Sequence, residues 1–407
     1  MGATLTSLSG VLKELYEPPL RKQLNAELVG LQRIERSSNG VESTVGGKYV
    51  TFPIHVGRNS GVGARRELET LPAAGQQKTT SVRIGLKYLY GRIQMSGQTY
   101  ELADKNYQTF ISAMDLEMNG IKDDVGKDQN RQVYGDGTGA LTTISGANTG
   151  NVIPVANAQW LQEDEIIDIY TAANLASDSS PLAGGVGLTI ISIDLTAGAN
   201  TITLSGTPAT PTVAATQVIV RTGNANREWV GLKGMVNNSG IYENVNSATY
   251  GQWKSVVDTP GADRNISEGA ILANVDKVRK NGGQTSLLLT TLGVRAAYFA
   301  LVSQLRQFVN TTEFTGGFKG LAFTTDKGDI PLLSDVDAPP GTIWGLSEKN
   351  ITIYRDADWS FMNRDGSMWD RLVDKDGYEA RLFQYSEMAT DRRNTHFRMD
   401  RIIEAAI

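Results

Sequence analysis

The chain of 407 residues contains no cysteine and only two histidines, His55 and His396. The absence of cysteine excludes disulfides, thiolate zinc sites and cysteine nucleophiles, and it is consistent with synthesis in a reducing cytosol. Neither histidine has the sequence partners that a metal site or a catalytic dyad needs. We therefore predict two packed or interfacial histidines, no cofactor and no catalysis.

The chain also lacks long apolar runs and an excess of basic charge. No run approaches the roughly 20 residues that cross a bilayer, and the N-terminus lacks the basic and apolar blocks of a signal peptide, so we expect no membrane contact. The net charge of −5 argues against wrapping of nucleic acid by an overall positive field. With 40% hydrophobic residues the chain can bury a core and divide into two or three domains.

A basic hairpin is predicted near the N-terminus. Residues 49–54 have a strand pattern, a glycine-rich tip spans 57–63, and one long strand returns over 80–95. At about 3.3 Å per residue the return strand reaches roughly 45 to 50 Å, which is about the width of a compact domain of this size, so the hairpin extends past its own core. The side chains expected to share its inner face are Val82, Ile84, Leu86, Tyr88 and Tyr90.

The charge of this hairpin is one-sided. Glu67 and Glu69 are its only acids. Its cations are Lys48, Arg58, Arg65, Arg66, Lys78, Arg83, Lys87 and Arg92. A complementary acidic surface is therefore expected elsewhere.

A long amphipathic helix follows over 99–134, because apolar residues recur there every three or four positions. The glycine-rich run 135–139 resembles a phosphate loop, but such a loop precedes a helix and this run follows one. We interpret it as a helix stop. A helix of this length is expected to be the scaffold of its domain.

Residues 150–226 are rich in Thr, Ala, Gly, Val and Ile and poor in charge, which predicts a small β-barrel or sandwich inserted in the main fold. Its expected strands are 166–170, 188–195, 201–204 and 217–221. The acids Glu163, Asp164 and Glu165 are interpreted as solvated turn charge, because successive strand residues point to opposite faces.

From 227 onward helices and strands alternate. A helix capped by Asn265 with Glu268 is expected to stop at Gly282, followed by a buried strand over 285–289. A second helix over 292–308 should turn Ala296, Phe299 and Ala300 inward. Further strands are predicted at 342–346, 351–354, 379–388 and 395–402, the last two as an antiparallel pair.

The acid-rich region 356–376 leaves two interpretations open. Its aspartates do not match the spacing of a twelve-residue calcium loop with a closing glutamate, so salt bridges to the basic hairpin of a neighbouring copy explain them as well. The nearby aromatics Trp359, Phe361 and Trp369 suit sugar or base binding, but core or interface packing is the more common role.

The order of parts resembles that of the tailed-bacteriophage major capsid family, with the α+β Hong Kong 97 type fold. The parts are an N-terminal arm, a long basic hairpin, one long helix, a mixed α/β domain and a final β segment; within the last, 348–354 and 384–401 look like the closing P-domain strands of that family. On this resemblance the expected divisions are an N-terminal arm (1–46), the E-loop hairpin (47–94), the P-domain spine helix (95–149), the inserted β-rich domain (150–226), the A-domain (227–340) and the closing P-domain strands (341–407).

The resemblance implies a structural protein of the virion, assembled in the host cytoplasm, and not an enzyme. Copies of the chain would form hexamers and pentamers of an icosahedral shell around double-stranded DNA, through a procapsid that expands, with only weak non-specific DNA contacts. A portal protein would be a partner, and a decoration protein is a further candidate. Because only about 46 residues precede the hairpin, a separate scaffolding protein is expected in place of the long cleaved segment of some relatives.

The residues predicted to make the inter-subunit contact are Arg58, Arg65, Arg66 and Lys78 of the hairpin, opposed by Asp356 and Asp358 of a neighbour. Some relatives form Lys to Asn crosslinks, but no signature supports one between Lys48 or Lys78 and Asn363, so non-covalent contact is predicted. Two alternatives remain at this point. One is an encapsulin-type nanocompartment with the same fold, and the other is a carbohydrate-binding β-protein.

Overall fold

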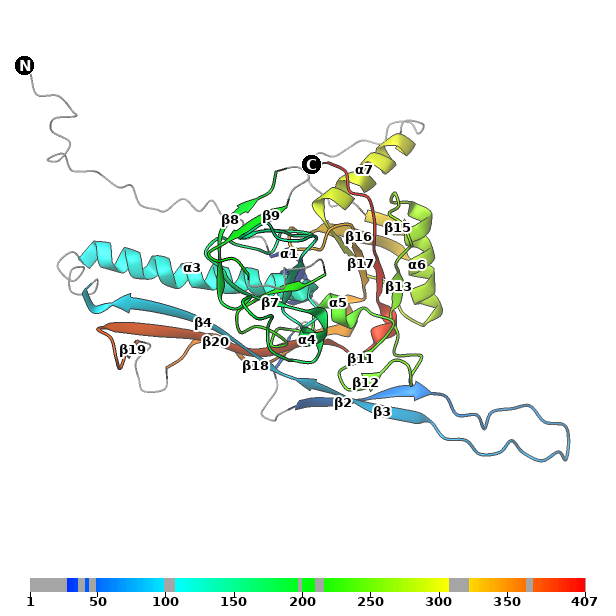
Figure 1. Cartoon of the computed structure of the whole chain (residues 1–407). Coiled ribbons are helices and arrows are strands. Elements are labelled where there is room, and N and C mark those ends of the chain that lie inside the picture. Colours follow the sequence, from blue (N-terminus) through cyan, green and yellow to red (C-terminus); the bar gives the residue numbers. More distant parts are fainter. Residues whose placement is uncertain are drawn as a thin grey trace, which may run out of the picture.

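The computed structural model describes residues 28–35, 41–43, 49–98, 107–196, 200–208, 216–306, 322–363 and 369–406. Three sheets of five or six strands form the body, and a two-stranded arm projects from it (Figure 1). The helix predicted from the period over 99–134 is present as α3 (Tyr107–Tyr134), and its predicted start lies outside the described residues. So do most of the predicted N-terminal arm and Lys48.

The first sheet carries α3 along one face (Figure 1). Its strand order is β1-β18-β20-β19, with β4 paired to β20. The strands are β1 (Val41–Ser43), β4 (Lys87–Ser96), β18 (Ile351–Phe361), β19 (Asp370–Arg371) and β20 (Gly377–Thr390). Gly91 allows the close approach of α3, because a Cβ there would lie 3.0 Å from Ile121 Cδ1 and 3.2 Å from Val125 Cγ1.

The single return strand predicted over 80–95 is wrong, because the chain uses two strands there. β3 (Lys78–Gly85) pairs with β2 (Tyr49–Gly57) in the arm, whereas β4 leaves the arm and pairs with β20. Val82 and Ile84 are fully buried, but Tyr88 and Tyr90 are 61% and 60% exposed. The buried face changes at Leu86: even-numbered side chains are the more buried ones in β3 and odd-numbered ones in β4. Side chains alternate along a strand, so a break of one residue between two strands moves all later side chains to the opposite face.

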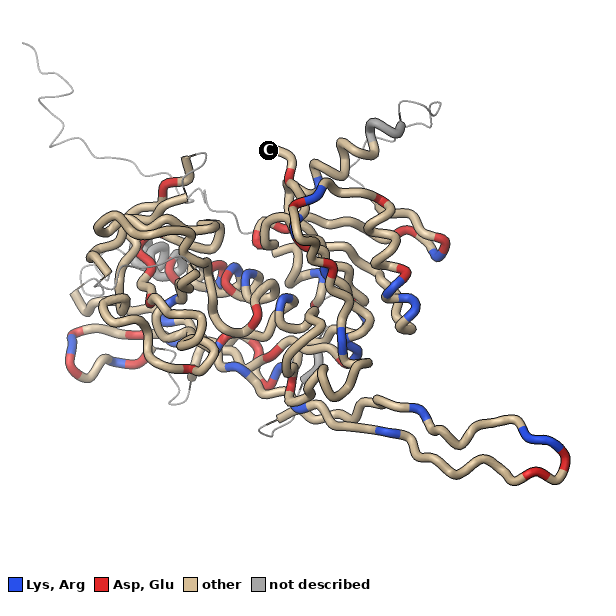
Figure 2. Tube along the Cα trace, turned by 45° about the vertical axis from the view of Figure 1, so that its right-hand side comes forward, with Lys and Arg blue, Asp and Glu red and all other residues tan. Residues whose placement is uncertain are grey.

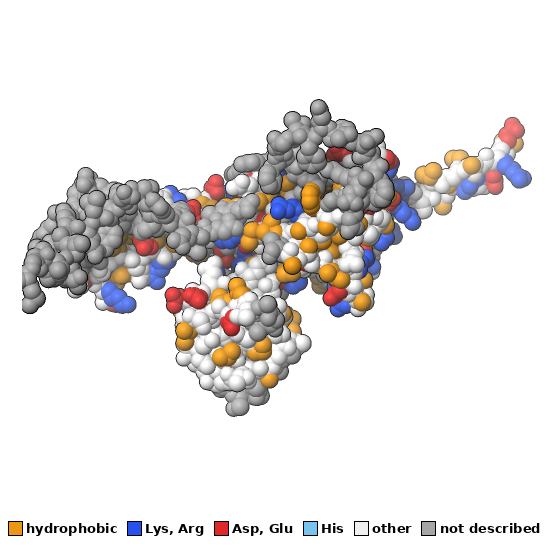
Figure 3. All heavy atoms as spheres, turned by 90° about the horizontal axis from the view of Figure 1, so that it is seen from above, with side chains coloured by type: hydrophobic (Ala, Val, Ile, Leu, Met, Phe, Trp, Pro, Cys, Tyr) orange, Lys and Arg blue, Asp and Glu red, His pale blue; other side chains and the backbone are white. Residues whose placement is uncertain are grey.

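The second sheet forms a lobe on one side of the molecule (Figure 3). Its strand order is β5-β10-β7-β8-β9-β6, with every pair antiparallel. The strands are β5 (Ala140–Thr143), β6 (Val152–Pro154), β7 (Ile166–Tyr170), β8 (Leu188–Asp194), β9 (Thr201–Leu204) and β10 (Val218–Arg221). It has its own aliphatic core and carries one short helix, α4 (Ala172–Ala176). The four strands predicted here are confirmed.

The third sheet has the order β13-β21-β17-β14-β16-β15. Its strands are β13 (Val256–Asp258), β14 (Leu287–Thr290), β15 (Ala322–Thr325), β16 (Gly328–Ser334), β17 (Ile343–Leu346) and β21 (Phe397–Met399). Helices α6 (Glu268–Lys280) and α7 (Leu292–Arg306) pack on it and share its core. The remaining elements are α1 (Val29–Glu35), α5 (Leu232–Met235), the short strands β11 (Ile241–Tyr242) and β12 (Val245–Asn246), and the 3-10 turns η1 (Glu348–Asn350) and η2 (Arg393–Thr395).

Three predictions in this region are wrong in detail. The N-cap of α6 is Ser267, whose hydroxyl accepts a hydrogen bond from the Ala270 amide, and not Asn265. Phe299 of α7 is 54% exposed and Ala300 is exposed too, while Val294 and Tyr298 face the core. The last two strands are not a pair, because β20 belongs to the first sheet and β21 pairs with β17 and β13. The domain bounds given above remain predictions.

Candidate assembly site

The arm is a two-stranded ribbon whose outer part is a long exposed loop. β2 and β3 pair from Tyr49 opposite Gly85 to Gly57 opposite Lys78, and residues 58–77 continue beyond the pairing. Asn59 closes the neck of this loop, since its Nδ2 donates to the Gly75 carbonyl at 2.9 Å and its Oδ1 accepts from the Gly61 amide at 2.7 Å. The arm projects well beyond the body (Figure 1).

The tip of the loop combines bare aliphatic side chains with cations. Val62, Leu68 and Leu71 are 88%, 102% and 80% exposed. Arg65 and Arg66 lie between Val62 and Leu68 in the sequence of the loop, and Figure 2 shows basic and acidic residues at the end of the arm. Apolar side chains this exposed at the end of a projecting loop are typical of an interaction surface.

A hairpin from the body holds the base of the arm. Its turn, Glu243-Asn244 between β11 and β12, has φ angles of 47° and 62°, as in two-residue hairpin turns. The Arg83 amide of β3 donates to Asn244 Oδ1 at 2.8 Å, and Asn244 Nδ2 donates to the Ser81 carbonyl at 3.3 Å. The arm is thus fastened along β3, a few residues before β4 begins. The strand pattern of 80–95 contained no signal for this contact.

Two carboxylates lie next to this junction. Glu387 of β20 is 1% exposed, and its Oε1 accepts hydrogen bonds from the Val230 and Met388 amides at 2.8 and 3.1 Å. Burial raises the pKa of Glu387 well above its usual range, and the nearby Glu243 adds to this. Burial also raises the pKa of Glu243 to about 7, against the attraction of Lys87.

As the pH rises from about 4.5 to about 7, Glu243 and Glu387 should lower the stability of the chain, whereas the buried His396, whose pKa burial lowers to about 3, should raise it, because the unfolded histidine releases its proton in the same window. In this window the folded chain retains protons on Glu243 and Glu387 that the unfolded chain releases, so stabilisation present below pH 4.5 is lost. The loss due to the two carboxylates should be about 2–3 kcal/mol, allowing for the partial exposure of Glu243. Thermal unfolding of the unassembled parent chain and of a Glu387 variant, compared between pH 4.5 and 8, separates this loss from the opposite contribution of His396.

The variant Glu387→Gln, which keeps an acceptor oxygen but carries no charge, should lack the part of this pH dependence that Glu387 contributes, so its stability relative to the parent chain should increase with pH and it should unfold at a higher temperature than the parent at pH 8. The variant Asp329→Asn, at an exposed carboxylate on β16, is the matched control and should retain the slope of the parent chain. Equal slopes for Glu387→Gln and the parent would contradict the role assigned to this pair.

The structure places the predicted acids on β18. Asp356 is exposed, and the side chain of Asp358 is 72% exposed and lies 3.3 Å from an Arg355 guanidinium nitrogen. Within one copy they do not meet the cations of the arm, because the arm and the far end of β18 extend in opposite directions (Figure 1). The predicted contact between Arg58, Arg65, Arg66 or Lys78 and these acids therefore requires a second copy.

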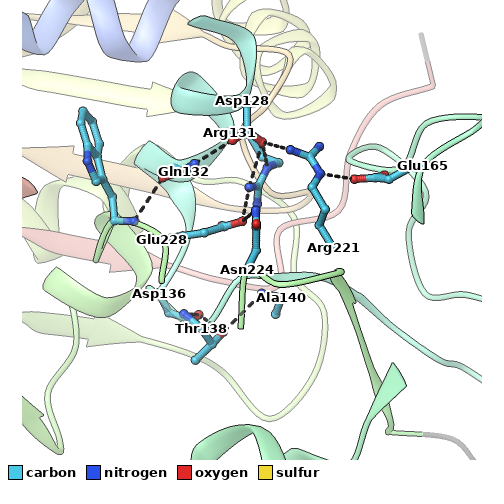
Figure 4. A network of polar contacts seen from close by, with 11 residues as sticks. Asp128, Arg131, Gln132, Asp136, Thr138, Ala140, Glu165, Arg221, Asn224 and Glu228 are labelled. Carbon is cyan, nitrogen blue, oxygen red and sulfur yellow. Dashed lines mark hydrogen bonds and ion pairs between the residues drawn. The ribbon is translucent and has the colours of Figure 1, made fainter. Parts of the chain in front are cut away.

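A buried network of charges joins the end of α3 to the lobe (Figure 4). Arg131 donates to Glu228 at 2.6 Å and to Asp128 at 3.0 Å. Arg221 of β10 donates to the same Asp128 at 3.0 Å and to Glu165 at 2.6 Å. Burial opposes the charge of Asp128, but Arg131 and Arg221 outweigh it and hold its pKa below the usual value. Glu165 is thus part of this network, whereas Glu163 and Asp164 are exposed as predicted.

A second buried network fixes α1 to the same helix. Asn130 donates to Asp337 at 2.6 Å and accepts from the Leu31 amide at 3.0 Å. Asp335 accepts from the Gly30 amide at 2.7 Å and from the Tyr134 hydroxyl at 2.9 Å. Sequence reasoning missed both networks, although four consecutive polar residues, 129–132, at the end of an amphipathic helix were a usable signal.

The other candidate chemical groups have structural roles in the described part of the chain. His396 is fully buried between the Ser347 amide and the Thr390 hydroxyl, and burial lowers its pKa to about 3. His55 lies 2.6 Å from Gln77 on the arm. The run 135–139 ends α3, with Gly137 and Gly139 at φ 84° and 78°. The described residues contain no group of three or more His, Asp or Glu side chains arranged to hold a metal ion.

The aromatic residues of β18 pack on α3. The Trp359 indole donates to Gln129 at 2.9 Å, and Lys122 lies over the Phe361 ring at 5.7 Å. These contacts agree with the packing role preferred for Trp359 and Phe361. Among the described helices, none combines the length and apolarity needed to cross a membrane.

Comparison with solved structures shows close similarity of fold. A capsid subunit of Cyanophage A-1(L) superposes with a TM-score of 0.61 over 98% of this chain and 99% of that chain, at 13% sequence identity. A subunit from the capsid of a native GTA particle superposes with a TM-score of 0.52 over 99% and 100% of the two chains, at 9% identity. Searches against protein-family models and curated proteins found no match.

The chain has the Hong Kong 97 type capsid fold. In the terms of this fold, α3 is the spine helix, the first sheet with α3 corresponds to the P-domain, and the β2-β3 arm corresponds to the E-loop. Since the superposition covers both chains almost completely, the fold prediction made from the order of parts is confirmed. The buried Arg131 network thus joins the spine helix to the lobe, and the β11-β12 hairpin fastens the E-loop to the body.

Proposed function

We propose that this chain is the major capsid protein of a tailed bacteriophage, which self-assembles into the icosahedral head shell around double-stranded DNA. The observation that supports this most directly is the E-loop, a projecting arm with exposed aliphatic and cationic side chains on a fold similar to that of phage capsid subunits. In a monomer the arm contacts no partner. In a closed shell the arm of every copy can be buried against a neighbour, so the same contact is repeated across the whole assembly.

We further propose the finer points that the sequence suggested. The inter-subunit contact uses Arg58, Arg65, Arg66 and Lys78 against Asp356 and Asp358 of a neighbour, without a covalent crosslink. The copies form hexamers and pentamers of a procapsid that later expands, with the help of a separate scaffolding protein and a portal. Contacts with the packaged DNA are weak and non-specific, and the chain acts as a structural protein of the virion and not as an enzyme.

The test is electron microscopy of the purified chain, expressed alone and together with a candidate scaffolding protein. Closed shells or tubes support the proposal, and their diameter constrains the number of copies. Shells that enclose a protein cargo in place of DNA would instead support the encapsulin-type alternative. Monomers that persist under both conditions would overturn the proposal.

A further inference from the structure

A groove of about 1270 Å³ runs along the base of the E-loop. One wall is β2, from Val50 to Val56, and Arg58 lies at its end. The rest of the lining comes from four separate parts of the body: the loop containing Lys254, the end of α6 with Lys280, the start of β18 with Thr352 and Tyr354, and the turn after β20 with Arg392.

The groove collects positive charge that the described carboxylates do not neutralise by ion pairs. Arg58, Lys254, Lys280 and Arg392 are all exposed, and none of the four forms an ion pair with a described carboxylate. The carboxylate that lines the groove, Asp391, accepts a hydrogen bond from Asn350 at 2.7 Å. Four cations from four segments that converge on one concave surface favour an anionic occupant.

The wall formed by β2 indicates that the occupant is an extended polypeptide and not nucleic acid. Residues from both faces of β2 line the groove in unbroken succession, as expected when a strand turns its edge toward it. In the described chain β2 pairs with β3 alone, so the groove-side edge has unpaired main-chain groups. Pro53, which has no amide hydrogen, is compatible with such an edge position. An added strand would pair with this edge.

This chain itself carries an acidic strand end of the required kind. Beyond Arg355, where the pairing with β1 stops, no described strand pairs with the outer edge of β18. Asp356 and Asp358 are exposed on this segment, and β18 is irregular between Arg355 and Ser360. Because the segment extends away from the E-loop (Figure 1), a groove on one copy and this segment on the next would meet in a head-to-tail contact, which closes into rings under rotation.

We propose that the basic groove at the base of the E-loop binds the Asp356–Phe361 end of β18 from a second copy, by edge pairing with β2 and by ion pairs with Lys254, Lys280 and Arg392. This inference rests on the proposed capsid function and extends the predicted contact. Arg58, Asp356 and Asp358 belong to the contact predicted from the sequence and also to the one proposed here. Lys254, Lys280 and Arg392 were not part of the predicted contact and are added because they line the groove.

Because the chain has no cysteine, any disulfide that forms must join thiols introduced by substitution. A pair of single-cysteine variants therefore tests one contact between copies. Thr51→Cys and Ser360→Cys are both at exposed positions, one on β2 and one on the β18 end. When the two single variants are co-assembled and oxidised, a disulfide-linked dimer containing one of each should form. Thr51→Cys co-assembled with Lys327→Cys, on the exposed β15-β16 turn, is the control and should remain monomeric on a denaturing gel. Shells that form normally but give no more dimer than this control would overturn the inference and leave the capsid function standing.

Charge exchange tests the ionic part. Lys254→Glu with Lys280→Glu should reduce the yield of assembled particles at least tenfold, and adding Asp356→Lys with Asp358→Lys to the same chain should restore most of it. Lys327→Glu, the same type of substitution at one exposed lysine outside the groove, should leave the yield unchanged. Loss without restoration would overturn the pairing. The pairing would also be overturned if the variant with Lys254→Glu and Lys280→Glu assembled normally but no longer bound a double-stranded DNA oligonucleotide. That result would assign the groove to DNA. Failure of the parent chain to assemble would instead count against the capsid function itself.

Discussion

A chain whose E-loop tip is removed should fold normally and build no shells. In this variant residues 59–76 are replaced by Asn-Gly, which joins Arg58 to Gln77 through a two-residue hairpin turn. The base of the arm remains anchored, because Val82 and Ile84 lie in the main core and Asn244 holds β3. The lost surface contains Val62, Leu68 and Leu71, which stabilise a neighbour contact and not the isolated chain.

Gel filtration with light scattering and electron microscopy would measure the assembly, and circular dichroism would report the fold. We expect a folded monomer with an unfolding temperature near that of the parent and at least a hundredfold loss of particles. A full-length chain with Arg58, Arg65 and Arg66 changed to Gln is the control that separates charge from length. It should still assemble, but less well, because surface ion pairs contribute only about 0–1 kcal/mol each. Normal particles from the shortened chain would refute the role of the arm.

The second large effect should come from Arg131, the centre of the network between the spine helix and the lobe. Arg131→Met should lower the free energy of unfolding by about 3–5 kcal/mol, because Glu228, only 3% exposed, would keep a buried charge without its cation. Asp128 would lose one of its two guanidinium partners as well. Urea unfolding of the unassembled chain, followed by tryptophan fluorescence, measures the change.

Arg279→Met supplies the matched control. Arg279 pairs with Asp326 at 2.7 Å, but the two side chains are 45% and 65% exposed, so the change in free energy of unfolding should be below about 1 kcal/mol. Combining Arg131→Met with Glu228→Gln should recover part of the loss, since the amide removes the unpaired charge. If Arg131→Met cost no more than Arg279→Met, the network would not be the anchor described above.

The sequence predicted the elements better than their partners. Helix α3, the four lobe strands and β14 could be found because hydrophobic periods of 3.6 and 2 residues are local properties of the chain. The hairpin over 49–95 shows where local reasoning stops. Its strand pattern continues through Leu86 without interruption, yet β3 belongs to the arm and β4 to the P-domain sheet. The choice between these partners depends on β20, which lies some 290 positions further along the chain.

The candidate site divides in the same way. One-sided charge over 47–94 and acids over 356–376 are matters of composition, so the sequence by itself determined that this is a cysteine-free α+β chain with a long basic arm and an acidic region to oppose it. Only the tertiary structure decided which side chains converge. It placed Lys254, Lys280 and Arg392 in one groove with β2, joined Glu165 and Arg221 to the spine helix through Asp128, and fastened the arm with Asn244. The physical reason is that these contacts join residues tens to hundreds of positions apart, and their geometry follows from how the sheets pack, which no local pattern contains.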